Sequence, residues 1–142
     1  MYEIVISNLS IRNVARSANS NSLVDFWVRV ENCDELYIYD LVITADNGEE
    51  TDPLPKDLKL KNLISVNNVM KVYIKNLTIS GYAPHQLIYL TQINELTIES
   101  LTITNCFNPA AEAASLELAV LSIIGVQNAT LRNFSMTKCS CY

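Results

Sequence analysis

The sequence predicts an all-β fold, a right-handed parallel β-helix (β-solenoid) of about five coils with variable-length loops at one corner. Three observations predict it. An octet with alternating apolar residues occurs five times. Four of its copies extend upstream on one unbroken template, and only the connections between copies differ in length. A period of two buries one face of a strand, whereas helical repeats need a period near 3.6.

Each octet has apolar residues at its first, third, sixth and eighth positions, and the two-residue interruption indicates a corner. The copies are Ile4–Ile11, Leu36–Ile43, Val72–Ile79, Leu96–Ile103 and Ala129–Met136. With their upstream extensions, the last four place seven apolar residues each on the same inward pattern, in residues 28–43, 64–79, 88–103 and 121–136. An all-β sandwich would not keep the corner offset fixed four times, so the β-helix is favoured.

The connections between templates are predicted to be insertions at one corner. They cover 16, 20, 8 and 17 residues, in 12–27, 44–63, 80–87 and 104–120. Such insertions cost little entropy, and the general rule for parallel crossovers gives the right hand. One of them contains a helix-like stretch, Pro109–Leu118, which we expect to cover a flank or an end. Residues 1–142 then form a single β-helix domain.

Two rows of corner residues are expected to adopt the left-handed conformation that Asn, Asp and Gly tolerate. Stacked Asn side chains could also hydrogen-bond along the stack. The rows are Asn8, Asp40, Asn76, Ser100 and Asn133, and Asn32, Asn68, Gln92 and Gly125.

The composition excludes several classes of protein. Nearly half of the chain is apolar and the net charge is −5, which argues against nucleic acid as a partner. No run of 18 apolar residues is present, so no membrane span is expected. The first residues do not form a signal peptide, so a signal for secretion would lie outside this sequence.

The phrase Leu-Thr-Ile-x-Asn-Cys at Leu101–Cys106, with a degraded copy at Phe134–Cys139, carries a family resemblance. The template resembles the pectin-lyase-like superfamily. More narrowly, it is similar to the β-helix repeat regions of secreted surface proteins of unicellular eukaryotes. The resemblance covers nearly the whole chain and concerns fold and repeat, so it specifies no activity.

Enzymes of that superfamily use clustered Asp residues, and no such cluster is found here. The two outward rows without paired carboxylates are Ser7, Tyr39, Lys75, Glu99 and Arg132, and Val5, Tyr37, Tyr73, Thr97 and Thr130. The first row is expected to form weak ion pairs between coils. His85, the only histidine, is expected to be solvated. The acidic segment Asp46–Asp57 is either a calcium loop or, as we favour, a solvated insertion. We therefore expect no enzyme activity, catalytic residue, metal or cofactor.

The cysteines have three expected roles. Cys106 and Cys139 follow the last inward residues of adjacent coils by three positions, and a disulfide is favoured over two free thiols. Cys33 occupies an inward position and is expected to be a buried thiol. Cys141 has no clear partner in the chain and could bond to another chain.

Four Asn-x-Ser/Thr sequons, at Asn8, Asn76, Asn128 and Asn133, are candidates for N-linked glycans. Asn128 is favoured. The other three share a corner row, which carries sugar only if it points outward, and the sequence leaves that open. Cysteines and sequons together indicate a secreted, extracellular protein. Outward Tyr37, Tyr73 and Tyr89 could bind carbohydrate or be ordinary strand surface.

Neither end of the repeat shows a capping element, although proteins normally cover a β-helix end. Either the chain is a segment of a longer solenoid, or its ends stack on copies of itself. We expect a structural extracellular protein, a glycosylated building block of a filament, coat or cell-surface assembly that stacks end to end. The alternative is a carbohydrate-binding or adhesion module, and a non-catalytic piece of a polysaccharide-processing enzyme ranks third.

Overall fold

A computed structural model describes residues 1–12, 28–44, 62–81, 86–105, 107–108, 119–138 and 140–141. The strands are β1 (Glu3–Ser7), β2 (Ser10–Arg12), β3 (Val28–Tyr39), β4 (Val42–Thr44), β5 (Asn62–Ser80), β6 (Gln86–Thr104), β7 (Phe107–Asn108), β8 (Ala119–Thr137) and β9 (Ser140–Cys141). These parts of the chain contain no helix and therefore none that could cross a membrane. The all-β prediction is confirmed.

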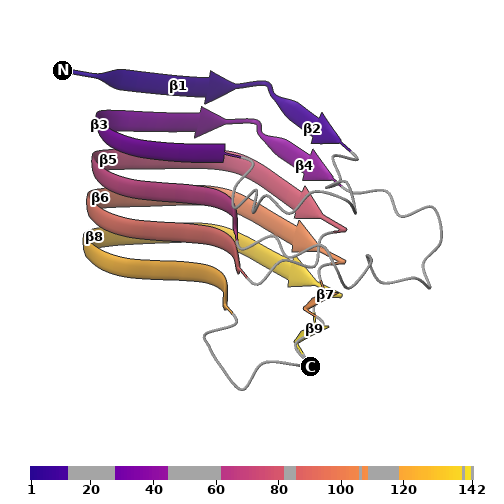
Figure 1. The fold of residues 1–142 in the computed structure, drawn as a ribbon. Coiled ribbons are helices and arrows are strands. Elements are labelled where there is room, and N and C mark those ends of the chain that lie inside the picture. The colour runs from indigo at the N-terminus through magenta and orange to yellow at the C-terminus, as the bar shows by residue number, and fades with distance from the viewer. Residues whose placement is uncertain are drawn as a thin grey trace, which may run out of the picture.

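Seven strands form one parallel sheet in which each copy of the octet lies on the next. Figure 1 shows them as successive levels from β1 and β2 to β8. The register matches equivalent template positions throughout: Ile4 pairs with Leu36, Leu36 with Val72, Val72 with Leu96 and Leu96 with Ala129. The sequence template therefore gives the strand register directly. A second, two-stranded sheet pairs β7 with β9.

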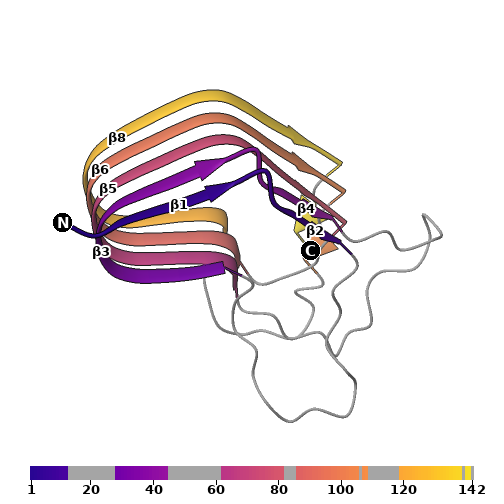
Figure 2. The same ribbon diagram turned by 90° about the horizontal axis from the view of Figure 1, so that it is seen from above.

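The long strands bend at the predicted corners, as Figure 2 shows from above. All nine residues of the two predicted corner rows have φ between 52° and 65°. Left-handed backbone is costly for most side chains, and Asn, Asp and Gly occupy seven of these nine places. A third row, Gly81, Asn105 and Lys138, also has positive φ. It ends the third strand segment of each coil, and the sequence analysis did not identify it.

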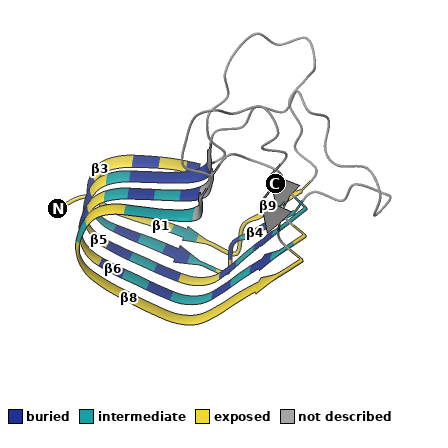
Figure 3. Cartoon of the chain, turned by 90° about the horizontal axis from the view of Figure 1, so that it is seen from below, coloured by how far each residue is buried: buried dark blue, intermediate teal, exposed yellow. Residues whose placement is uncertain are grey.

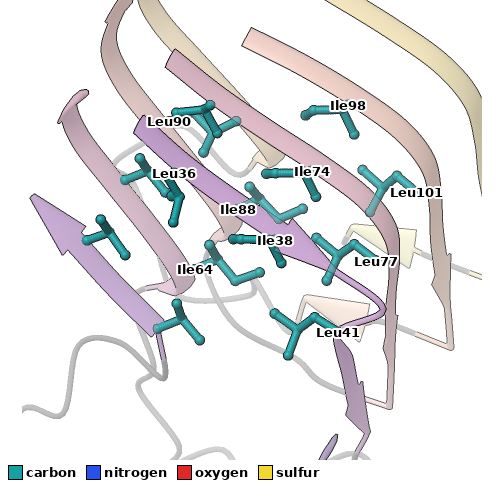
Figure 4. Packing of buried hydrophobic residues seen from close by; sticks show 14 of the residues in the cluster. Leu36, Ile38, Leu41, Ile64, Ile74, Leu77, Ile88, Leu90, Ile98 and Leu101 are labelled. Atoms are coloured by element: carbon teal, nitrogen blue, oxygen red, sulfur yellow. The ribbon is translucent and has the colours of Figure 1, made fainter. Parts of the chain in front are cut away.

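The core consists of apolar side chains stacked in rows that run across the coils. Every inward template position in residues 28–43, 64–79 and 88–103 is buried. In Figure 4, Ile38, Ile74 and Ile98 form one such row, and Leu41, Leu77 and Leu101 form another. A residue in these rows is shielded by its equivalents in the coils on both sides. Burial thus depends on stacking and not on one strand alone.

Truncation in an interior row should be costly. We expect Ile98→Ala to lower the free energy of unfolding by about 2–5 kcal/mol, because Ile98 is 1% exposed and its neighbours above and below cannot close the cavity. Thr97→Ala, one residue away on the outward face, is the matched control. Urea denaturation measures both. Equal losses would contradict the assignment of faces.

The corner conformation should tolerate glycine but not a β-branched residue. Asn68 has φ 54° and donates from Nδ2 to Asn32 Oδ1 over 2.7 Å. We expect Asn68→Val to cost at least about 1–2 kcal/mol more than Asn68→Gly, because both lose the hydrogen bond but only valine meets the left-handed strain. If urea denaturation gave equal losses, the side-chain bond and not the backbone would govern the corner.

Candidate functional site

The last coil exposes the apolar side chains that every interior coil buries. On β8, Leu131, Phe134 and Met136 are 47%, 44% and 43% exposed. Their equivalents one coil earlier, Ile98, Leu101 and Ile103, are at most 1% exposed. The contrast is visible in Figure 3, where β8 is yellow beside the dark blue of β5 and β6. The cause is position: β8 is packed by β6 on one side only.

The first coil is open in the same way over a smaller area. Ile4 on β1 is 37% exposed and Leu9, between β1 and β2, is 41% exposed. Ile6 and Ile11 are partly buried against the core. The octet that forms an interior layer elsewhere is therefore a surface at both ends of the stack.

Both end coils also carry an unpaired strand edge. Within the described sheet, β1 pairs with β3 alone, β2 with β4 alone and β8 with β6 alone. The other edge of each strand presents backbone N–H and C=O groups that no described strand satisfies. An edge of this kind is a template for another strand, so apolar surface and unpaired backbone coincide at each end.

Polar ladders run along two corner rows. Asn68 Nδ2 donates to Asn32 Oδ1 over 2.7 Å, and Asn76 Nδ2 donates to Asp40 Oδ1 over 2.8 Å. All four side chains are exposed. The sequence left open whether the row of Asn76 points inward as a ladder or outward. The structure shows an outward row that still forms a ladder bond.

The four sequon asparagines all lie on the surface. Asn8, Asn76 and Asn133 occupy the same exposed corner row, and Asn128 is exposed on β8. Three of the four belong to the end coils. Asn76, in an interior coil, uses its amide in the bond to Asp40.

Three tyrosines form a cluster on the outward face of β3 and β5. The ring centroids of Tyr37, Tyr39 and Tyr73 are 5.7 to 6.4 Å apart. Tyr89, which the sequence analysis grouped with two of them, pairs instead with Ser65 and Ser122 in the first segment of its coil. Tyr39 was missed as a member, although it lies two residues from Tyr37 and therefore on the same face.

The tyrosine cluster is held by its own polar partners. Tyr73 donates to Glu99 Oε2 over 2.9 Å and Tyr37 to Glu35 Oε2 over 2.7 Å. These bonds favour the protonated phenols, and they are the main reason that the pKa of each tyrosine is raised. Lys71 Nζ lies 5.7 Å from the ring centroid of Tyr37, and its pKa is raised chiefly by its hydrogen bond to that tyrosine.

The expected ion pairs between coils do not form. Lys75, Glu99 and Arg132 lie opposite one another in register. Among the described residues, however, the ion pairs are Arg29 with Glu31 at 2.7 Å and the Met1 amine with Asp34 at 3.8 Å. The Glu99 carboxylate accepts from Tyr73 instead. Exposed ion pairs contribute so little that a phenol on the neighbouring strand competes successfully.

Cys33 is a free thiol and 7% exposed, and burial raises its pKa, so the prediction of a buried thiol is confirmed. Cys106 and Cys139 lie outside the described residues. The strands that follow them, β7 and β9, pair in parallel. His85, Asp46–Asp57 and Pro109–Leu118 also lie outside. The described parts of the chain hold no group of three side chains suited to a metal ion.

Comparison with protein-family models, with curated proteins and with solved structures finds no significant match. The functional argument therefore rests on the geometry of the two stack ends and of the tyrosine cluster.

The tyrosine cluster should be detectable by titration. Because the pKa values of Tyr37 and Tyr73 lie above 10.0, the stability that they contribute is fully present below that pH. It is lost as the pH rises through their folded-state pKa values. We expect the double variant Tyr37→Phe, Tyr73→Phe to lose the most alkaline part of the tyrosinate absorbance curve. Tyr89→Phe removes a tyrosine outside the cluster as a control, and an unchanged curve in the double variant would contradict the hydrogen bonds.

Proposed function

We propose that this chain is a structural building block, a right-handed β-helix whose coils continue end to end into those of further copies. The β-helix is supported by the register, in which equivalent positions of five octets lie on one another. It is supported further by connections of variable length that return the chain to the same starting corner. The resemblance to pectin-lyase-like proteins agrees with this fold.

One observation carries the proposal: both ends combine exposed inward side chains with an unpaired strand edge. Leu131 and Phe134 at one end, and Ile4 and Leu9 at the other, are all between 37% and 47% exposed. Full burial of such a side chain contributes about 1.5–3 kcal/mol, and a joint would complete the burial of several at once. It would also pair the edge groups by strand addition.

We propose an extracellular setting for the assembly. The four exposed sequons, Asn8, Asn76, Asn128 and Asn133, and a disulfide between Cys106 and Cys139 suit an oxidising compartment. Asn128 is the favoured glycan site. A glycan on Asn76 would instead disrupt its hydrogen bond to Asp40.

Carbohydrate binding or adhesion is the second candidate, and the cluster of Tyr37, Tyr39 and Tyr73 favours it. We rank it lower because the hydroxyls of Tyr37 and Tyr73 already have carboxylate partners and the rings pack against one another. Catalysis is not proposed, since the outward rows bring no two carboxylates together.

Electron microscopy of the natively purified, unreduced protein tests the proposal. We expect filaments with an axial repeat of about 24 Å, the height of five strand spacings of about 4.8 Å. Leu131→Lys should abolish them, because it places a charge in the joint, whereas Thr130→Lys on the outward face of the same strand is the matched control. Isolated particles for the unmodified protein would refute end-to-end stacking.

A further inference from the structure

The apolar pattern alone does not set the direction of a joint. The inward residues of the second half of β8 are Ala129, Leu131, Phe134 and Met136, spaced by two, three and two. The first coil has the same spacing, in Ile4, Ile6, Leu9 and Ile11. This spacing reads the same in both chain directions. By apolar matching, β8 could therefore accept either the first coil of another copy in parallel or another β8 in antiparallel.

The left-handed corner residue removes this ambiguity. Asn133 and Asn8, with φ of 54° and 52°, each stand directly before the third inward position. In a parallel joint the two corners coincide, as they do at every interior level. In an antiparallel pairing of two β8 strands, matching the inward residues would place Asn133 opposite Arg132. The bends of the two strands would then be out of step, and the edges could not stay paired across the corner.

We infer that β8 receives β1 and β2 of the next copy head to tail, with residues 128–137 against residues 3–12 and Asn133 opposite Asn8. The two asparagines are the residues that fix register and polarity. This inference rests on the proposed function and names the partner surface within it. The first half of β8, residues 119–125, is not part of the joint.

The ladder bonds support this register. In both observed bonds, the amide of the later coil donates to the oxygen of the earlier one, from Asn68 to Asn32 and from Asn76 to Asp40. With Asn133 opposite Asn8, the next copy's Asn8 amide can donate to the Asn133 oxygen and continue the ladder. A slip of two residues would place Asn8 opposite Ser135, within a straight segment.

The charges at the joint are also compatible. In this register Glu3 faces Asn128, Ser7 faces Arg132 and Arg12 faces Thr137, so no like charges are opposed. Like charges directly opposite each other destabilise a strand pair.

Cross-linking between single-cysteine variants tests the register. Val5 is 53% exposed and Thr130 is exposed, and the two face each other in the inferred joint. Adjacent strands are about 4.8 Å apart, within the range of a disulfide. We expect a mixture of Val5→Cys and Thr130→Cys proteins to give covalent heterodimers on oxidation, severalfold more than either variant alone or the unmodified protein. Val5→Cys mixed with Asn128→Cys or Arg132→Cys, both shifted by two residues, is the matched control.

The outcomes separate the two levels of the argument. Preferential cross-linking to position 128 or 132 would overturn the register, and efficient homodimers of Thr130→Cys would overturn the polarity, while both leave end-to-end assembly standing. Absence of association by sedimentation for all proteins would remove the proposed function itself. Asn133→Gly, which keeps the corner conformation, should retain more of the Val5–Thr130 cross-link than Asn133→Val. Equal yields would overturn the role of the corner.

Discussion

The structure depends on one constraint, that each inward side chain is buried only when an equivalent side chain lies on both sides of it along the stack. Ile98 lies between Ile74 and Leu131 and is 1% exposed, whereas Leu131, with a neighbour on one side, is 47% exposed. The two residues have the same place in the template and similar apolar volume. What separates them is the next coil, so stability in this fold belongs to the stack and not to any single coil.

The corners follow from that constraint. Equivalent side chains can stay aligned only if every coil bends at the same place, which explains why residues as different as Asn68, Gln92 and Gly125 share a positive φ. The cost of this conformation is local, and it is offset by the apolar rows on either side of the bend. Where two asparagines are adjacent in a row, their amides add a hydrogen bond as well.

These same facts explain what could be predicted from the sequence. Inward positions, register, the two corner rows and the burial of Cys33 follow from a period of two with a fixed interruption, because burial selects side chains strictly. The partners of exposed groups do not follow. Glu99 could accept from Lys75, Arg132 or Tyr73, and the differences in energy are small. The third corner row was missed because Gly81, Asn105 and Lys138 have no residue type in common and lie where each coil enters a connection of different length.

The two candidate surfaces differ in how far their groups are already satisfied. At the tyrosine cluster, the hydroxyls of Tyr37 and Tyr73 have carboxylate acceptors and the rings pack on one another. At the ends, apolar side chains and strand edges have neighbours on one side only, in strands of nineteen residues at β8 and of five and three residues at β1 and β2. A partner gains most where burial and pairing are both incomplete. The first coil of a second copy supplies both in the same geometry that holds the interior together, which is why assembly at the ends is the stronger interpretation.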